Sequence, residues 1–261
     1  ACASSTVGLH VAVDYVRAGL ADCVLVVVVE KLYSDDRAKK FAVFQQPRDL
    51  IEAEAYLAKT ASLLAPVPQG GESVSPNILM QAYAAQARLH MATYGSTQRQ
   101  IAAVAAKDHG HSVHNPLSQY RKAMGIDEVL AAPTVAWPLT NPMCAPISDG
   151  ASAAIVCSAD WAKRFPDARA VRVLAAESQT GSERAPDDYA KHVTRIVGAR
   201  AYEKAGVGPG DIDVAEVHDA SSIGEMIQTE ALGLCGPGEA GLAAERGETA
   251  LGGRIPVNVS G

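Results

Sequence analysis

Residues 1–29 read ACASSTVGLHVAVDYVRAGLADCVLVVVV and indicate the fold class of this chain. Apolar residues recur at helical spacing over residues 4–19. The candidate N-caps of that helix are Ser4, Ser5 and Thr6, and Gly19 marks its end. After a short loop, the apolar run Val24–Val29 predicts a strand at the centre of a sheet covered on both faces. Helix, loop and buried strand together favour an α/β fold.

The composition excludes several classes of protein. The 261 residues are 48% apolar and 20% charged, which argues against disorder, collagen-like repeats and coiled coil. The run Val24–Val29 is far shorter than the roughly 20 residues that cross a bilayer, so no membrane span is expected. A net charge of −6 gives no general attraction for nucleic acid. Five cysteines without a C-x-x-C pair favour reduced thiols and a cytoplasmic location.

The middle of the chain, residues 31–135, has the pattern of a helical excursion from a sheet domain. Ser75-Pro76 is typical of a helix start, and apolar residues then recur at helical spacing. A second helix is expected to begin at Thr97, where Gln100 completes a capping box, and to run to about His109.

The last third alternates between predicted strands and helices, which is the pattern of an α/β unit. Residues 148–158 form a small-residue turn followed by an apolar strand. The further predicted strands are Val171–Ala175 and Asp213–Val217, and the predicted helices are about 189–205 and 221–232.

Cys2 and His218 are the candidate catalytic residues. Cys2 lies just before the first predicted helix, whose free amide groups and dipole favour a thiolate. His218 follows a predicted strand and precedes a helix, a position where α/β sheets gather ligands. An imidazole there can stabilise an oxyanion or move a proton. The alternatives are a buried filler cysteine and a surface histidine, and sequence separation alone does not show that the two meet.

No metal site or phosphate loop is expected. His109, His111 and His114 form an H-x-H-x-x-H cluster. Asn115-Pro116 forces an extended segment directly after it, which argues against all three histidines lying on one face and binding a metal. The glycines at 206, 208 and 210 lack the frame of a nucleotide-binding loop. Cys144, Cys157 and Cys235 are expected to be structural.

Four segments, in order along the chain, resemble the thiolase superfamily, and within it the sterol-carrier-protein-type and lipid-transfer-protein-like thiolases. Residues 1–13 (ACASSTVGLHVAV) look like the nucleophile loop and helix, and residues 217–240, beginning VHDASSIGEM, look like the HDCF-type segment. Residues 114–140 and 142–156 look like the linker and the start of the second half-domain. The resemblance implies a five-layered fold of two βαβαβ halves with a helical loop domain.

The resemblance also implies the site. Cys2 would be the acylated nucleophile, and His218 would help to form the oxyanion hole for the thioester oxygen. His90 and Met91 resemble a pair that lines the pantetheine pocket. Coenzyme A and acyl-CoA are the implied substrates, with no other cofactor, and a homodimer or homotetramer is the implied assembly.

Departures from the family pattern qualify these expectations. Ala220-Ser221 replaces Cys-Phe after His218-Asp219, which makes the pocket floor smaller and more polar, and Ala145 replaces an expected serine that contacts CoA. Family members continue past residue 261 through Gly-His-Pro and Cys-x-Gly segments, which supply the base for Cys2 and an acid/base cysteine. We therefore expect a segment incomplete at both ends and inactive by itself.

Three domains are expected: residues 1–30 as the end of the N-terminal half, 31–135 as the loop domain and linker, and 136–261 as the start of the C-terminal half. The leading functional hypothesis is a CoA-dependent acyltransferase that works through an acyl-cysteine. One alternative is a retro-aldol lyase on 3-hydroxyacyl-CoA with a small zinc-ribbon/OB-fold partner. Another is a non-catalytic scaffold that binds acyl-CoA or lipid.

Overall fold

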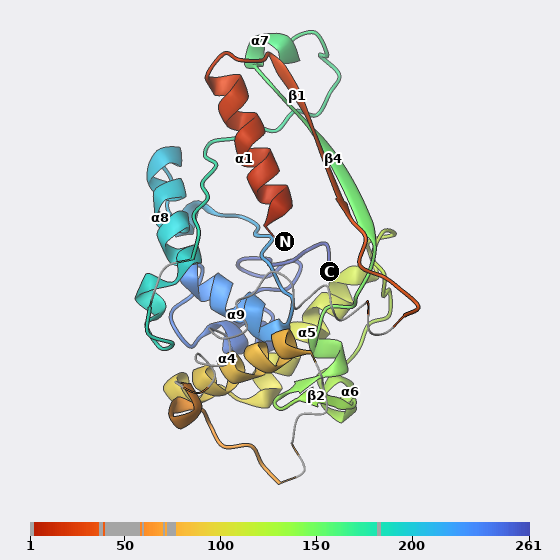
Figure 1. Ribbon diagram of the computed structural model, residues 1–261, viewed down its shortest axis with the longest axis vertical. Coiled ribbons are helices and arrows are strands. Elements are labelled where there is room, and N and C mark those ends of the chain that lie inside the picture. Colours follow the sequence, from red (N-terminus) through yellow and green to blue (C-terminus); the bar gives the residue numbers. More distant parts are fainter. Residues whose placement is uncertain are drawn as a thin grey trace.

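The fold is described here from a computed structural model (Figure 1), which covers residues 3–36, 39, 58, 60–69, 71, 77–181 and 184–261. The α-helices are α1 (Ser4–Arg17), α4 (Ile78–Tyr94), α5 (Gln98–Ser112), α6 (Ile126–Ala131), α7 (Ala159–Ala162), α8 (Val193–Ala205), α9 (Ser222–Ala231) and α10 (Ala240–Glu245). The strands are β1 (Cys23–Glu30), β2 (Thr134–Ala136), β3 (Leu139–Thr140) and β4 (Gly150–Cys157). Short 3₁₀ turns are η1 (Ala61–Leu63), η2 (Asn141–Met143), η3 (Tyr189–Lys191) and η4 (Pro209–Asp211).

Helix α1 and the β1–β4 ribbon project from a helical body made of α4, α5, α6 and α9 (Figure 1). β1 and β4 are antiparallel along their whole length, with Cys23 opposite Cys157 and Glu30 opposite Gly150. One face of β1 packs on α1, since a Cβ at Gly8 would lie 3.5 Å from the Val26 Cγ1 atom. The N-terminal end of α1 points toward the helical body (Figure 1).

The prediction that Val24–Val29 is covered on both faces is wrong. Leu25, Val27 and Val29 are 64%, 61% and 67% exposed, while the alternate valines are partly covered. In the described part of the chain β1 pairs only with β4, so a run without alternation acquires the half-buried pattern of an antiparallel ribbon. The strand itself is confirmed.

The main core lies between α4, α5, α9 and α10, with α6 and β2–β3 closing one side. Its fully buried large side chains include Ile101 on α5 and Met226 on α9. Small residues let these helices approach closely: a Cβ added at Gly241 of α10 would lie 2.8 Å from the Gln100 Cβ of α5. This packing fixes the position of α9, and with it the loop that carries His218.

Local start signals predict the middle helices well. Thr97 caps α5 through its side chain and Gln100 returns the bond, which confirms the capping box, although α5 runs beyond His109 to Ser112. Ser75-Pro76 lies outside the described residues, and Asn77 caps α4. Helix α1 begins at Ser4 without a side-chain cap, so the three predicted N-caps are wrong.

The last third contains the predicted helices but fewer strands than expected. Helices α8, preceded by η3, and α9 confirm the two predicted helices. No strand forms at Val171–Ala175, where Val171 is 90% exposed and no strand among the described residues pairs with it. The predicted strand Asp213–Val217 is reduced to one parallel bridge between Ala215 and Val257.

The three-domain division stays a prediction, but the pairing of β4 crosses it. β4 lies in the range 136–261, and yet it joins β1 from the range 1–30 along its full length. In the described part of the range 31–135, the regular elements are the helices η1, α4, α5 and α6 and the start of the short strand β2. No helix in the described ranges is both long and apolar enough to cross a bilayer.

Candidate active site

A cavity of about 390 Å³ opens where the N-terminal end of α1 meets α4, α9 and the start of α8. Its lining residues are Ala3, Thr6, Ala82, Tyr83, Gln86, His192, Val193, Thr194, His218, Gly224, Ile227 and Gln228. Four elements far apart in the sequence therefore bring small, aromatic and imidazole side chains to one concave surface. Such a convergence of polar groups on a partly apolar pocket is typical of a ligand site.

His218 reaches this cavity from the loop between Ala215 and α9. The backbone on either side of it is held: the Val217 amide donates to the Asn258 Oδ1 atom over 2.7 Å, and the Gln228 side chain donates to the His218 carbonyl oxygen. The His218 residue itself is exposed. A held backbone with an accessible imidazole suits a hydrogen-bond donor to a bound ligand.

Cys2 lies outside the described residues, and its role stays a prediction. The next residue, Ala3, lines the cavity together with Thr6. The first turn of α1, which follows the predicted nucleophile, therefore opens into the same cavity as His218. The backbone amide groups of the first turn lie at the end of this 14-residue helix that meets the cavity.

His192 is a cavity residue that sequence analysis missed. Its Nδ1 atom accepts from the Thr194 amide over 3.3 Å and caps α8, which leaves Nε2 as the N–H donor. Burial, and then the charge of Arg184, lower the pKa of His192 to about 4. The imidazole is therefore neutral at physiological pH. Its only sequence signal was a polar residue at a helix start, because histidine is an unusual cap.

His90 and Met91 do not line the cavity. His90 is fully buried, with Nδ1 2.8 Å from the Ser96 hydroxyl and Nε2 3.0 Å from the Glu230 Oε2 atom. Met91 packs against the main core. Their predicted role in substrate binding stays a prediction, and this position at the α4–α9 interface gives it no support. Gln86, one turn before His90 on α4, is the residue that lines the cavity.

Within the histidine cluster, the ring of His111 is likewise held by structural bonds. His111 Nδ1 lies 2.9 Å from the Asn258 carbonyl oxygen, and His111 Nε2 accepts from the Leu251 amide over 3.1 Å. Burial lowers the pKa of His111, in keeping with a neutral ring. Cys144 and Cys235 are free thiols whose pKa burial raises to about 12, which disfavours the thiolate and a nucleophilic role.

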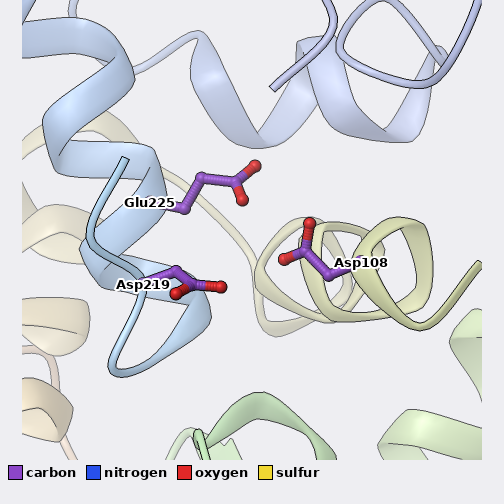
Figure 2. A group of neighbouring side chains, drawn as sticks. All are labelled: Asp108, Asp219 and Glu225. Carbon is purple, nitrogen blue, oxygen red and sulfur yellow. The ribbon is translucent and has the colours of Figure 1, made fainter. Parts of the chain in front are cut away.

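A second group of titratable residues lies beside the cavity (Figure 2). Asp108 of α5, Glu225 of α9 and Asp219 from the loop before α9 direct their carboxyl groups toward one another, with one oxygen from each within 4.8 Å of the others. Lys107 Nζ lies 2.6 Å from the Asp108 Oδ1 atom and 2.8 Å from the Glu225 Oε1 atom. Oxygen donors of this kind suit a hard cation, but the Lys107 ammonium contacts two of them already.

The electrostatics of this cluster follow from burial. Burial raises the pKa of the Asp108, Asp219 and Glu225 carboxyl groups, and the nearby Lys107 opposes that rise at each. For Lys107, burial acts to lower the pKa, but the Glu225 and Asp108 carboxylates outweigh it and leave that pKa raised. A larger cavity of about 760 Å³ lies on the Asp108–Asp219 side of the cluster. It does not include His218 or α1, so the smaller cavity is the candidate active site.

Comparisons with known proteins relate the chain to thiolases. Residues 175–261 match the family "Thiolase C-terminal domain-like". The whole chain aligns with sterol carrier protein 2 of Bos taurus at 35% identity, covering 47% of it, and with an acetyl-CoA acetyltransferase of Methanothermobacter thermautotrophicus at 35%, covering 63%. The chain is therefore similar to members of the thiolase superfamily along its whole length, and its last third matches the thiolase C-terminal domain. It spans about half the length of the sterol carrier protein relatives it matches.

The fold agrees with that similarity. The thiolase-like chain superposes on the solved Ltp2-ChsH2(DUF35) aldolase with a TM-score of 0.71 and 22% identity, over 98% of this chain and 63% of the other. A thiolase-like fold, as the sequence motifs predicted, is therefore confirmed. At that identity the likeness concerns the fold.

Proposed function

We propose that the protein containing this chain is a CoA-dependent acyltransferase of thiolase type, acting through an acyl-Cys2 intermediate with His218 as a donor to the thioester oxygen. The observation that supports it is the cavity shared by the first turn of α1 and His218. The similarity to thiolases supports the same reaction class, since an acetyl-CoA acetyltransferase is among the relatives at 35% identity.

The first half-reaction forms the acyl-Cys2 intermediate. The Cys2 thiol loses its proton, and its sulfur attacks the 3-keto carbon of a 3-oxoacyl-CoA. The bond between the second and third acyl carbons breaks, and its electron pair stays on the departing acyl-CoA, which gains a proton. The amide groups at the N-terminal end of α1 favour the Cys2 thiolate. His218 donates to the thioester oxygen as negative charge develops there.

The second half-reaction transfers the acyl group to CoA and regenerates the free Cys2 thiol. The thiol of CoA loses its proton and attacks the acyl carbon bound to Cys2; the Cys2 sulfur leaves and regains a proton. CoA acts as a substrate, and the proposal uses no other cofactor. A homodimer or homotetramer is part of the same proposal.

The test is thiolysis by the intact protein. Replacing Cys2 with alanine should abolish the reaction, whereas the matched control Cys23→Ala on β1 should leave it unchanged. His218→Ala should lower kcat about 100- to 1,000-fold, as for other oxyanion donors. Full activity of Cys2→Ala would refute the proposal. A ketone or aldehyde formed from a 3-hydroxyacyl-CoA without consumption of CoA would favour the retro-aldol lyase, and ligand binding without chemistry would favour a scaffold.

A further inference from the structure

The segment Ile255–Asn258 runs beside residues 215–217, directly before His218. The Ala215 amide donates to the Pro256 carbonyl oxygen over 3.0 Å, and the Asn258 amide donates to the Ala215 carbonyl oxygen over 2.8 Å. The Asn258 side chain continues this ladder, since its Oδ1 atom accepts from the Val217 amide over 2.7 Å. Through its side chain, Asn258 thus holds Val217, the residue directly before His218.

The backbone and side-chain polar groups of Asn258 all form hydrogen bonds. Its Nδ2 atom donates to the Glu225 Oε2 atom over 2.8 Å, and its carbonyl oxygen lies 2.9 Å from His111 Nδ1. The residue is 3% exposed and adopts a left-handed backbone with φ of 51°, where asparagine is better tolerated than most residues. Because a carboxylate only accepts, the Asn258 amide must present its nitrogen to Glu225 and its oxygen to Val217.

Lys107 completes the arrangement. Its Nζ atom donates to the Val257 carbonyl oxygen over 2.7 Å and forms an ion pair of 2.8 Å with the Glu225 Oε1 atom. The ammonium therefore favours the charged, acceptor-only form of Glu225 that sets the orientation of the Asn258 amide. Buried, fully satisfied networks of this kind specify one geometry.

We propose that Asn258 is a positioning residue for His218, acting through the Val217 amide and oriented by Glu225 and Lys107. This inference rests on the proposed function of His218. The three residues come from α5, α9 and the C-terminal segment, and they meet one residue before the imidazole. Loss of the side chain frees the Val217–His218 backbone, so that His218 donates less well in the transition state than the fixed group does.

The test uses Asn258→Gly in the intact protein, because glycine accepts the left-handed backbone and removes only the side chain. The matched control is Asn115→Gly, since Asn115 Nδ2 also binds the C-terminal segment, at the Ser260 carbonyl oxygen over 3.0 Å, while its Oδ1 atom accepts from the Leu117 amide rather than from the Val217 amide. We expect hydrogen exchange of the Val217 amide to accelerate and kcat to fall at least about tenfold in Asn258→Gly, with KM for CoA unchanged. The control should leave both Val217 exchange and kcat at the wild-type values.

A second variant keeps the inference testable if Asn258→Gly does not fold. Asn258→Asp keeps an oxygen acceptor for the Val217 amide but faces Glu225 with a second carboxyl group. It should lose stability while retaining Val217 protection and a kcat within about threefold of wild type. A large loss of kcat with intact Val217 protection would overturn the inference, as would a wild-type kcat in a folded Asn258→Gly.

Failure of the proposed function gives a different result. If the intact wild-type protein carries out no acyl transfer, the proposed function is refuted. The imidazole NMR signals of His218 then decide the positioning role: changed signals in Asn258→Gly but not in Asn115→Gly support it, and identical signals overturn it.

Discussion

Replacing Lys107 with methionine removes the ammonium group from the carboxylate cluster while keeping the length of the side chain. The Lys107 side chain is 3% exposed and contacts Asp108 over 2.6 Å and Glu225 over 2.8 Å. Removing one partner of a buried ion pair typically costs about 3–5 kcal/mol, because the remaining charges stay buried without compensation. We expect a loss of that size in the free energy of unfolding at pH 8.

The loss should depend on pH in a defined direction. Burial raises the folded-state pKa of the Asp108, Asp219 and Glu225 carboxyl groups above the usual 3.8 to 4.5. Their folded state thus binds more protons than the unfolded state, so stability falls as pH rises through the raised pKa values. Without Lys107, which opposes the rise, these pKa values move higher still. The destabilisation by Lys107→Met should therefore be smallest near pH 5 and largest at pH 8.

The assay is urea denaturation of the intact protein at both pH values, read as the shift in midpoint at constant slope. The matched control is Lys163→Met, which removes an ion pair with Asp160 whose side chains are 77% and 90% exposed. That variant should match wild type at both pH values, because exposed ion pairs contribute little. A Lys107→Met loss below about 1 kcal/mol at pH 8, or one independent of pH, would refute the electrostatic reasoning.

Two further predictions concern α4 and α5. Thr97→Ala removes the cap bond to the Gln100 amide and should cost about 1 kcal/mol of stability in thermal unfolding; an unchanged melting temperature would contradict the role of the capping box. His90→Ala leaves the buried Glu230 Oε2 atom without its partner and should cost at least about 2 kcal/mol while KM for acyl-CoA stays unchanged. Gln86→Ala, which alters the cavity on the same helix, should raise KM with little loss of stability, and the reverse pattern for the two variants would restore a binding role for His90.

Features set by a few neighbouring residues could be predicted from the sequence. The capping box at Thr97 and Gln100 depends on a spacing of three residues, and the structure confirms it. The apolar run Val24–Val29 likewise predicts its strand from neighbouring residues alone. The number of covered faces depends on what packs against β1, which lies far away in the sequence, and there the prediction was wrong.

Some residues of the site could also be predicted from local sequence, and others could not. His218 could be proposed from its place between a predicted strand and a helix, and it lines the cavity. The Lys107 cluster joins α5 to residues 219 and 225, and Asn258 joins the C-terminal segment to Val217. Such contacts carry no local spacing signal. His192 had only a weak signal at the start of α8, so its place in the cavity emerged from the fold.

The most direct test of the proposed function is mass spectrometry of the intact protein, quenched in acid shortly after mixing with a 3-oxoacyl-CoA. We predict that one acyl group is bound and that peptide mapping places it on Cys2, that it disappears when CoA is added, and that Cys2→Ala carries none. An unmodified protein under conditions that consume the substrate, or an acyl group on another residue, would contradict the acyl-Cys2 mechanism.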